Sequence, residues 1–525
     1  MPTQAYRFDA NSDVEAWLNK LVGSDSWQTQ PWRETEGIFY DTFDWRLYSA
    51  GMTLEGRADE GRRHYSLWSL KDEFLIRCLD VEEPGFARDL PEGPLRQQLE
   101  PLLKMRRLLP RAVLRNRRKD LALLNSDGKT VLQMAVSVNR RVVDPRGEEK
   151  GLPAILRLLP IKGYTSAIRR IGARLDQDPG LQRMPVPPLL EALDALGKRP
   201  ADYSSKLFLE LSPQCTAEQA LRAVLLHLLA VIQANLDGTC KDIDSEFLHD
   251  LRVAVRRTRS ALGQIKGVLP EDDAAPFREG FAWLGSITGP TRDLDVYLLN
   301  FADYLQRLPE NHRPDLAAFH HFLQQRQAEE QKLLSRQLRS PRCTRLLADW
   351  ATLLHKESAT NSAPPEARRP IREVADRRIW KLFRRCVREG QAISSESPAE
   401  ALHELRKTCK KLRYLLEFFQ SLYPADAITE RIKALKGLQD NLGDFNDFEV
   451  QSEAMLDFGL QMAQKQQATP ATLLAMGMLA ESLRHQQFRT RQEFEQRFAA
   501  FCSDSNTQQF RRLFGKTKPK GASSP

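Results

Sequence analysis

The sequence has few cysteines and no long apolar run, and each absence excludes a class of protein. Its seven cysteines are scattered, odd in number and never spaced as C-x-x-C, a usage that gives no zinc site and is typical of a reducing cytoplasm. The most apolar stretch, residues 223–232, is too short to span a bilayer and contains His227, so it predicts a buried helix. The N-terminus lacks the basic and apolar regions of a signal peptide. We therefore expect a cytoplasmic protein without membrane insertion, metal or other cofactor.

Positively charged side chains exceed negatively charged ones only slightly. Lys and Arg number 78 against 69 Asp and Glu, which gives a formal net charge of +9 and a sequence pI of about 9.1. The surplus favours an anionic partner but is modest for 525 residues, so the placement of the cations matters more than their sum. A chain of this length is expected to contain about two to four domains.

A duplicated pattern organises the second half of the chain. HDLRVAVRRTRSAL begins at His249, and HELRKTCKKLRYLL begins at His403, which is 403 − 249 = 154 positions later. A second pair, LGSITGPTRDLDV from Leu284 and LQDNLGDFNDFEV from Leu438, keeps the same offset. Two matched segments in one register indicate an internal duplication. From about Thr216 the pattern is helical, with about four helices in each repeat, the number that closes a bundle core.

Histidine and cations follow one side of the helix in each repeat. Residues three, four and seven apart share a helix face, so an apolar stripe and a neighbouring polar stripe separate in both copies. The polar stripe and its flanks are His249, Arg252, Arg256, Arg257 and Arg259 in the first repeat, and His403, Arg406, Lys407, Lys410, Lys411 and Arg413 in the second. Another predicted helix, residues 371–388, adds Lys381, Arg384 and Arg388 at helical spacing.

A charged stripe on an amphipathic helix is ordinarily a solvated face. Solvated faces usually mix signs so that residues i and i+4 can pair, yet these stripes contain almost no acids. Like charges along one face repel one another unless an anion lies against them. The repetition at one offset therefore favours an anion-binding surface to which both repeats contribute.

The histidines and a recurring pair of acids have their own alternatives. In the first turn of their helices, His249 and His403 can each hydrogen-bond a phosphate oxygen or satisfy a neighbouring helix, and the sequence does not decide between these roles. The acids that recur are Asp293 and Asp295 in the first repeat, and Asp447 and Glu449 in the second. Acids two apart on a helix point to different faces and chelate metal poorly. We expect them to orient the arginines of the stripe rather than to catalyse a reaction.

Several local signals predict where elements begin and end. Residues 121–138 predict a hairpin, because the turn signal NSDG precedes an alternating apolar strand at 130–138. Residues 13–22 and 93–103 predict short helices. Thr216 and Ser397 are each followed three residues later by Gln or Glu, the capping-box pattern that begins a helix. Residues 455–474 are expected to contain an insertion relative to the first repeat.

The duplicated pattern resembles a known family. The motif H-x-L-R-x-x-x-[RK]-[RK]-x-R, followed by a segment that ends D-x-[DE]-V, is similar to the conserved-histidine α-helical domain, abbreviated CHAD. The resemblance covers roughly residues 216–515. It implies two four-helix bundles related by pseudo-twofold symmetry, which bind inorganic polyphosphate on a basic surface between them and localise to polyphosphate granules. The histidines and cations of the two polar stripes match that surface.

The N-terminal half is similar to the CYTH, or triphosphate-tunnel, domain. FYDTFD at 39–44 and AGMTL at 50–54 look like that family's second strand and helix. SLK at 69–71 and RNRR at 115–118 match its basic tunnel positions. The resemblance therefore implies a phosphate site at Lys71, Arg115, Arg117 and Arg118.

The acids of the same family do not match. Its opening acidic motif and its late acidic strand fall on Thr3, Ala5 and Arg7, and on Arg157, Leu159 and Ile161. Those acids would hold the divalent metal that neutralises triphosphate and positions the attacking water. We therefore expect a degenerate tunnel with no metal site and no metal-dependent hydrolysis.

Together these observations predict an α+β multidomain protein that binds polyphosphate and has no catalytic residues. The expected domains are a degenerate CYTH-like antiparallel β-barrel at 1–200, an all-α CHAD domain at 216–515 with bundles at 216–357 and 370–515, and a disordered basic tail at 516–525. One alternative is a metal-dependent triphosphatase in the N-terminal domain. The other is a nucleic-acid-binding protein, although the stripes offer few aromatic side chains for stacking, Tyr414 being the nearest.

Overall fold

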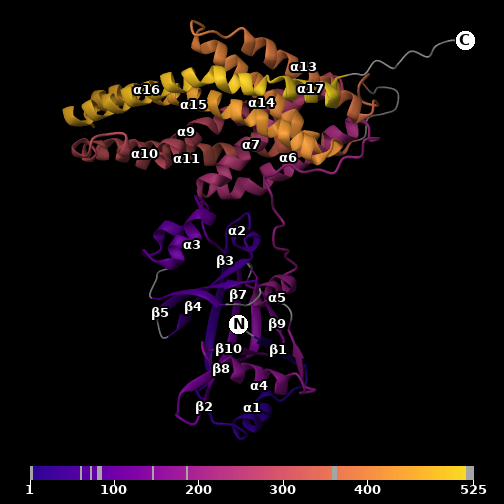
Figure 1. The fold of residues 1–525 in the computed structure, drawn as a ribbon, viewed down its shortest axis with the longest axis vertical. Coiled ribbons are helices and arrows are strands. Elements are labelled where there is room, and N and C mark those ends of the chain that lie inside the picture. The colour runs from indigo at the N-terminus through magenta and orange to yellow at the C-terminus, as the bar shows by residue number, and fades with distance from the viewer. Residues whose placement is uncertain are drawn as a thin grey trace, which may run out of the picture. The chain divides into compact units, whose positions relative to one another are not determined.

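The structure is a computed structural model that describes residues 4–59, 62–70, 74–79, 85–144, 147–184, 187–356 and 364–515. It divides into two compact units, Met1–Ser204 and Ser205–Pro525 (Figure 1). The first is an antiparallel sheet with short helices and the second is all helical, so the predicted fold class is confirmed. Lys71 and the predicted tail at 516–525 lie outside the described residues.

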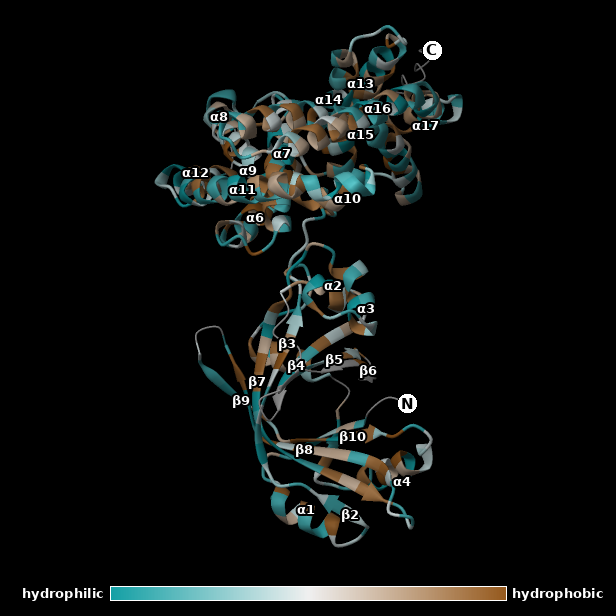
Figure 2. Ribbon diagram, turned by 90° about the vertical axis from the view of Figure 1, so that its left-hand side faces the viewer, coloured by the Kyte–Doolittle hydropathy of each residue, from teal (hydrophilic) through white to brown (hydrophobic). Residues whose placement is uncertain are grey.

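A curled sheet forms the first unit (Figure 2). Its strands pair in the order β11-β1-β10-β8-β7-β3-β4-β5-β6, with β2 also on β7 and β9 also on β8. The strands are β1 (Gln4–Phe8), β2 (Trp27–Thr29), β3 (Arg33–Asp41), β4 (Met52–Asp59), β5 (Arg62–Ser69), β6 (Phe74–Leu79), β7 (Leu109–Leu124), β8 (Thr130–Val143), β9 (Glu149–Leu152), β10 (Ile155–Pro160) and β11 (Leu181–Arg183). The helices are α1 (Val14–Val22), α2 (Arg46–Ser49), α3 (Pro94–Leu103), α4 (Thr165–Leu175) and α5 (Pro188–Ala195).

The predicted hairpin is confirmed, and it extends beyond residues 121–138 because β7 and β8 are longer than the turn signal reveals. At the turn, Asn125 Oδ1 accepts from the backbone N–H of Asp127 and of Lys129. Gly128 takes the left-handed conformation there, with φ of 74°. The two predicted helices correspond to α1, whose N-cap is Asp13, and to α3. The main apolar cluster of the unit packs α1 and α4 against β1, β7, β8 and β10.

The helical unit repeats itself at the predicted offset. Helices α6 and α13 begin at Ala217 and Ile371, α7 and α14 at Ser245 and Ala399, and α8 and α15 at Glu271 and Ala425, so each pair is 154 residues apart. The helices are α6 (Ala217–Cys240), α7 (Ser245–Gln264), α8 (Glu271–Ile287), α9 (Gly289–Leu299), α10 (Phe301–Gln306), α11 (Ala317–Leu338), α12 (Pro341–His355), α13 (Ile371–Gln391), α14 (Ala399–Phe418), α15 (Ala425–Gln464), α16 (Pro470–Phe501) and α17 (Asp504–Phe514). The duplication read from the sequence is thus present in the fold.

The repeats differ in the continuity of their third helix. In the first repeat this helix breaks between α8 and α9, where Pro290 cannot donate a backbone hydrogen bond, whereas α15 runs unbroken for 40 residues. Because α11 and α16 begin at Ala317 and Pro470, only 153 residues apart, the repeats return to register. The predicted insertion within 455–474 is therefore wrong, and the longer α15 takes the place of the broken helices and turns of the first repeat.

One of the two predicted capping boxes forms. Thr216 and Gln219 cap α6 reciprocally, as expected. The box at Ser397 is wrong, because α14 begins at Ala399 after Pro398, with no side-chain cap. The Ser397 hydroxyl instead accepts from the backbone N–H of Ser394 in the preceding turn.

The two repeats share a core. Apolar side chains of α9, α10 and α11 pack against those of α15 and α16 in one cluster, and α7 packs against α14. Among the described residues, α6 alone is long and apolar enough to cross a membrane by length and composition, and half of its apolar window is buried inside the unit.

Candidate functional site

The helices that carry the two polar stripes, α7 and α14, pack against each other (Figure 1). Across this contact, Arg257 Nη2 lies 2.7 Å from Glu417 Oε2, and the two side chains are only 14% and 12% exposed. We call Arg256 and Arg259 of α7, with Arg406, Lys410 and Arg413 of α14, the basic seam. It combines matching positions of the repeats, because Arg256 and Arg259 correspond to Lys410 and Arg413.

Lys410 lies in the most positive part of the basic seam. Burial and the charges of Arg406, Arg256 and Arg413 lower the pKa of Lys410 to about 8, with Asp447 acting in the opposite direction. Because Arg256 belongs to α7, its influence on Lys410 brings cations of both repeats to one point. Among the described residues, Lys410 forms no ion pair, and the carboxylate of Asp447, which pairs with Arg406, offsets the surrounding cations only in part.

Arg252 and Arg406, which match each other in the repeats, are held by the third helix of their own repeat. Arg252 Nη1 donates to Thr288 Oγ1 at 3.1 Å and to the carbonyl of Gly285 at 3.3 Å. Arg406 Nη2 lies 3.4 Å from Asp447 Oδ1. The expectation that the recurring acids orient the arginines fits this contact in the second repeat.

Acids neutralise more of the stripe than its sequence suggests. Glu417, one turn beyond Arg413 on α14, lies 2.7 Å from both Arg413 and Arg257, while Lys407 pairs with Glu404 at 2.6 Å. The interpretation that the stripes lack acids is therefore wrong for these three cations. Arg257 links the repeats through Glu417, and it also donates to the carbonyl of Ser205, which precedes the first repeat.

Both histidines are engaged by protein groups. His249 Nδ1 lies 3.1 Å from Arg292 Nη2 and accepts from it, because a guanidinium can only donate. Burial together with Arg292 lowers the pKa of His249. His403 Nε2 lies 2.7 Å from Glu449 Oε2. Of the two roles open for the histidines, these contacts match packing against a neighbouring helix.

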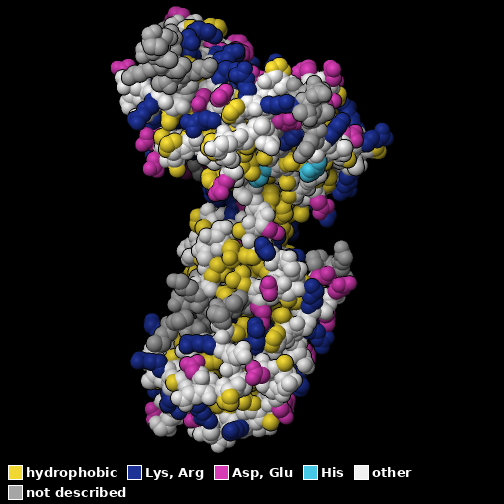
Figure 3. All heavy atoms as spheres, turned by 90° about the vertical axis from the view of Figure 1, so that its right-hand side faces the viewer, with side chains coloured by type: hydrophobic (Ala, Val, Ile, Leu, Met, Phe, Trp, Pro, Cys, Tyr) yellow, Lys and Arg dark blue, Asp and Glu magenta, His cyan; other side chains and the backbone are white. Residues whose placement is uncertain are grey.

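The additional cations of α13 do not join the basic seam. Lys381, Arg384 and Arg388 are all exposed, and helical spacing sets them on the face opposite Phe383 and Cys386, which are buried. In Figure 3, Lys and Arg side chains of the helical unit mix with Asp and Glu over the face in view, as on an ordinary solvated surface. Among the described residues, the stripe cations that form no ion pair are Arg252, Arg256, Arg259, Lys410 and Lys411.

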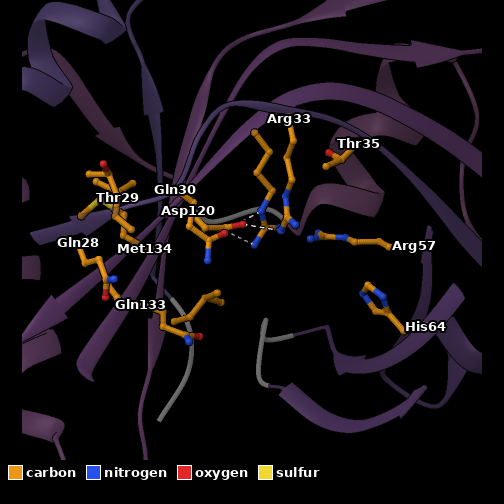
Figure 4. A pocket seen from close by; sticks show the side chains of 14 residues that line it. Gln28, Thr29, Gln30, Arg33, Thr35, Arg57, His64, Asp120, Gln133 and Met134 are labelled. Atoms are coloured by element: carbon orange, nitrogen blue, oxygen red, sulfur yellow. Dashed lines mark hydrogen bonds and ion pairs between the residues drawn. The ribbon is translucent and has the colours of Figure 1, made fainter. Parts of the chain in front are cut away.

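The curled sheet of the first unit contains a cavity of about 460 Å³ (Figure 4). Asp120 binds two of its arginines, Arg33 and Arg118, each at 2.7 Å. Burial and the nearby Arg57 lower the pKa of Arg118 to about 10. Arg118 was predicted from the basic motif, whereas Arg33, Arg57 and His64 also line the cavity but carry no motif in the sequence.

Arg115 and Arg117 of the predicted phosphate site do not line the cavity. Arg115 is 54% exposed and pairs with Glu36 and Glu149, while the Arg117 guanidinium lies 5.3 Å from the ring centre of Trp32. Side chains alternate across a strand, so Arg118 faces the cavity and Arg117 does not. Arg115 and Arg117 therefore lie outside the cavity, and Lys71 lies outside the described residues.

The described residues do not fit a divalent metal at this cavity. Strands β1 and β10 pair with Ala5 opposite Arg157, at positions where the tunnel family has acids. The Arg157 guanidinium lies 4.9 Å from the ring centre of Trp68. Although burial opposes it, Arg57 and Arg157 lower the pKa of Glu55. Among the described residues, no group of three or more His, Cys, Asp or Glu side chains is arranged to bind a metal.

Comparison with known proteins identifies a domain in the helical unit. Residues 223–456 match the family model of the CHAD domain. Two uncharacterized proteins of Mycobacterium tuberculosis, from strains CDC 1551 and H37Rv, are 26% identical over 280 residues, which are 50% of this chain and 52% of each relative. The chain thus spans about half the length of the curated relatives it matches.

Three solved structures are similar to parts of the chain. The chain is similar to the CHAD domain from the plant Ricinus communis, at 26% identity and a TM-score of 0.46, over 56% of this chain and 94% of that one. It is also similar to PptA from Streptomyces chartreusis, at 18% identity and a TM-score of 0.42, over 54% and 99%. HpAC1 from Hippeastrum, described as having a dominant triphosphatase activity, matches at 12% identity and a TM-score of 0.27, over 39% and 100%.

Proposed function

We propose that the CHAD domain of this chain binds inorganic polyphosphate along the basic seam without catalysing a reaction. The family match supports a ligand of the polyphosphate or triphosphate class. The observation that supports the proposal most is the set of cations around Lys410, whose pKa is lowered to about 8 by burial and by Arg406 and Arg256. An anion bound there would relieve the repulsion that Asp447 offsets only in part.

A linear phosphate chain suits the basic seam because the cations recur at helical spacing along two adjacent helices. Such a ligand needs rows of cations and no base-specific contacts, and the fork of an arginine can grip two phosphate oxygens. A nucleic acid would gain from stacking on aromatic rings. Tyr414 already stacks on Phe418, with 6.3 Å between ring centres, so polyphosphate is favoured over single-stranded nucleic acid.

Binding to long-chain polyphosphate at several salt concentrations tests the proposal. Each neutralised cation contributes about 0.7 to the slope of log affinity against log salt, by analogy with single strands, so about five or six cations predict a slope of roughly −4. Absence of binding at low salt would overturn the proposal. If RNA of equal charge displaces polyphosphate at equal concentration, a nucleic acid becomes the preferred ligand.

Hydrolysis in the first unit is the alternative function. It would need a divalent metal, and the described residues at the cavity do not provide its ligands. Phosphate release from tripolyphosphate with Mg²⁺ or Mn²⁺ decides between the two, since turnover that survives substitution of the basic seam would assign catalysis to the first unit.

We also propose that the protein associates with polyphosphate granules in the cytoplasm. A fluorescent fusion that loses granule association when Arg256 and Lys410 are changed to Gln would support this.

A further inference from the structure

Three lysines within one turn of α14 have different surroundings. Lys407 is 57% exposed and pairs with Glu404. Lys411 is half-buried and forms no ion pair among the described residues. Lys410 is also half-buried, and its charged neighbours are Arg406 and Arg413 on its own helix, Arg256 on α7 and Asp447 on α15, with which it forms no ion pair. The chain therefore contains one lysine amine set among arginines, together with two adjacent lysines for comparison.

We propose that Lys410 is a selective acylation site for acyl phosphates, small anions in which a phosphate leaving group activates a carboxyl carbon. The neighbouring arginines can bind the phosphate group through charge-assisted hydrogen bonds. A phosphate bound there brings the acyl carbon next to Nζ, because the lysine lies between arginines of both helices. Lys407 lacks this arrangement, since its nearest partner is a carboxylate that repels the reagent.

The reaction needs only the amine and the acyl phosphate. The neutral Nζ attacks the carbonyl carbon, the bond from that carbon to the phosphate oxygen breaks, and the phosphate leaves with the electron pair. Nζ then loses a proton to solvent, and an amide remains. No oxidant, reductant or metal takes part.

The amine must be deprotonated to attack. Burial and the neighbouring arginines lower the pKa of Lys410 to about 8. At about pH 7.5 the neutral amine is therefore roughly a quarter of the Lys410 population, whereas for an ordinary lysine it is about one part in a thousand. An amine with a lower pKa is also less nucleophilic, which offsets part of this gain. We expect Lys410 to react about tenfold faster than Lys411.

Acylation would remove the central charge of the basic seam. An amide carries no charge, so the remaining arginines would face a neutral group in place of an ammonium. Acylation would therefore weaken polyphosphate binding severalfold, and this consequence rests on the function proposed above. The selectivity of the reaction does not rest on that function, so the two proposals can fail separately.

The first experiment incubates the full chain with acetyl phosphate and measures acetylation at each lysine of α14 by peptide mass spectrometry. The same measurement with N-acetoxysuccinimide, an uncharged reagent, separates recruitment of the phosphate from reactivity of the amine. We expect preference for Lys410 over Lys411 with both reagents, and a larger preference with acetyl phosphate. Arg256→Gln should remove the extra preference while circular dichroism shows intact helices. Equal rates at Lys410 and Lys411, or the same preference with both reagents, would overturn the proposal.

The second experiment measures polyphosphate binding before and after acetylation. Lys410→Arg keeps the charge but cannot be acylated under these conditions, so its affinity should stay within about twofold of the unmodified protein and should not change after acetyl phosphate treatment. If acetyl phosphate treatment lowers the affinity of this variant as much as that of the unsubstituted protein, another lysine is responsible for the loss. The proposal that acylation of Lys410 weakens polyphosphate binding would then be overturned. If the unmodified protein does not bind polyphosphate, the proposed function fails, and the acetylation rates still decide the site.

Discussion

Arg257 of α7 and Glu417 of α14 form an ion pair across the junction of the two repeats, with 2.7 Å between Nη2 and Oε2. The same carboxylate pairs with Arg413 on its own helix. Glu417 thus joins the repeats and also neutralises one edge of the basic seam. Its two effects oppose each other, because the pair stabilises the fold while the negative charge disfavours a bound anion.

Glu417→Gln should separate these effects. Loss of the carboxylate leaves Arg257 buried without its charged partner, and the free energy of unfolding should fall by about 1–3 kcal/mol. The basic seam gains one net positive charge, so polyphosphate affinity at low salt should rise severalfold. Urea denaturation and fluorescence anisotropy measure the two quantities. In the control Glu404→Gln, which loses an exposed pair with Lys407, stability should change by less than about 0.5 kcal/mol. Weaker polyphosphate binding in Glu417→Gln would contradict the assignment of the site.

Substitutions in the basic seam and on α13 test which cations bind the ligand. Arg256→Gln with Lys410→Gln should lower the salt slope by about 1.4 units and the affinity at low salt at least tenfold. Arg384→Gln with Arg388→Gln removes the same charge from the exposed face of α13 and should cost less than about threefold. Both double variants should stay folded by circular dichroism. Equal losses in the two would mean that long-range net charge, and not the junction of the repeats, governs binding.

The sequence predicted the repeat unit well because the duplication is encoded in local patterns. The common offset of His249 and His403 matches the offset at which the first three helices of each repeat begin. Helical spacing also predicted which cations share a face of their own helix, such as the face of Arg256 on α7 and that of Lys410 on α14. The sequence also predicts the ion pair of Arg413 with Glu417, since Glu417 is four residues further along the same helix. The polar stripe defined from the sequence ends before Glu417 and therefore does not include this pair.

Contacts between distant segments could not be predicted in this way. The carboxylate beside His403 comes from α15, and the guanidinium beside His249 comes from α9, so neither histidine's role follows from its own helix. The cavity of the first unit draws Arg33 and Arg57 from separate strands, and only the pairing order of the sheet brings them together. Arg118 lines the cavity and Arg117 does not, a difference that a basic motif of four residues cannot show, because it does not indicate which alternate side chains face inward.

The lowered pKa of Lys410 gives stability and binding opposite dependences on pH. Burial and neighbouring cations set this pKa to about 8 in the folded protein, below the roughly 10.4 of an unfolded chain. The unfolded chain therefore binds more protons between these values, so the contribution of Lys410 to stability increases as pH rises from about 8 to about 10. Polyphosphate needs the charged form, so its affinity should fall over the same range.

Melting temperature and polyphosphate affinity at about pH 7, 8 and 9, for the wild type and Lys410→Met, measure this dependence. The variant should lose the part of each pH dependence that belongs to Lys410. At about pH 8.5 binding should also take up protons, which calorimetry in buffers of different ionisation enthalpy detects. Identical pH profiles for wild type and variant would show that Lys410 titrates like an ordinary lysine.

The arginine-lined cavity of the first unit gives the last prediction. Asp120 accepts ion pairs from Arg33 and Arg118 at 2.7 Å each, and burial with Arg57 already lowers the pKa of Arg118 to about 10. Asp120→Asn should remove the carboxylate that pairs with both guanidiniums and lower the free energy of unfolding of this unit by about 1–3 kcal/mol. Inorganic phosphate can replace the lost charge, so it should raise the melting temperature of the variant more than that of the wild type. Glu36→Gln, which removes an exposed partner of Arg115 on the other face of β7, should show neither effect. A destabilised Asp120→Asn that phosphate does not rescue would mean that the cavity cannot admit an anion, and the guanidiniums would then serve only to hold the curled sheet together.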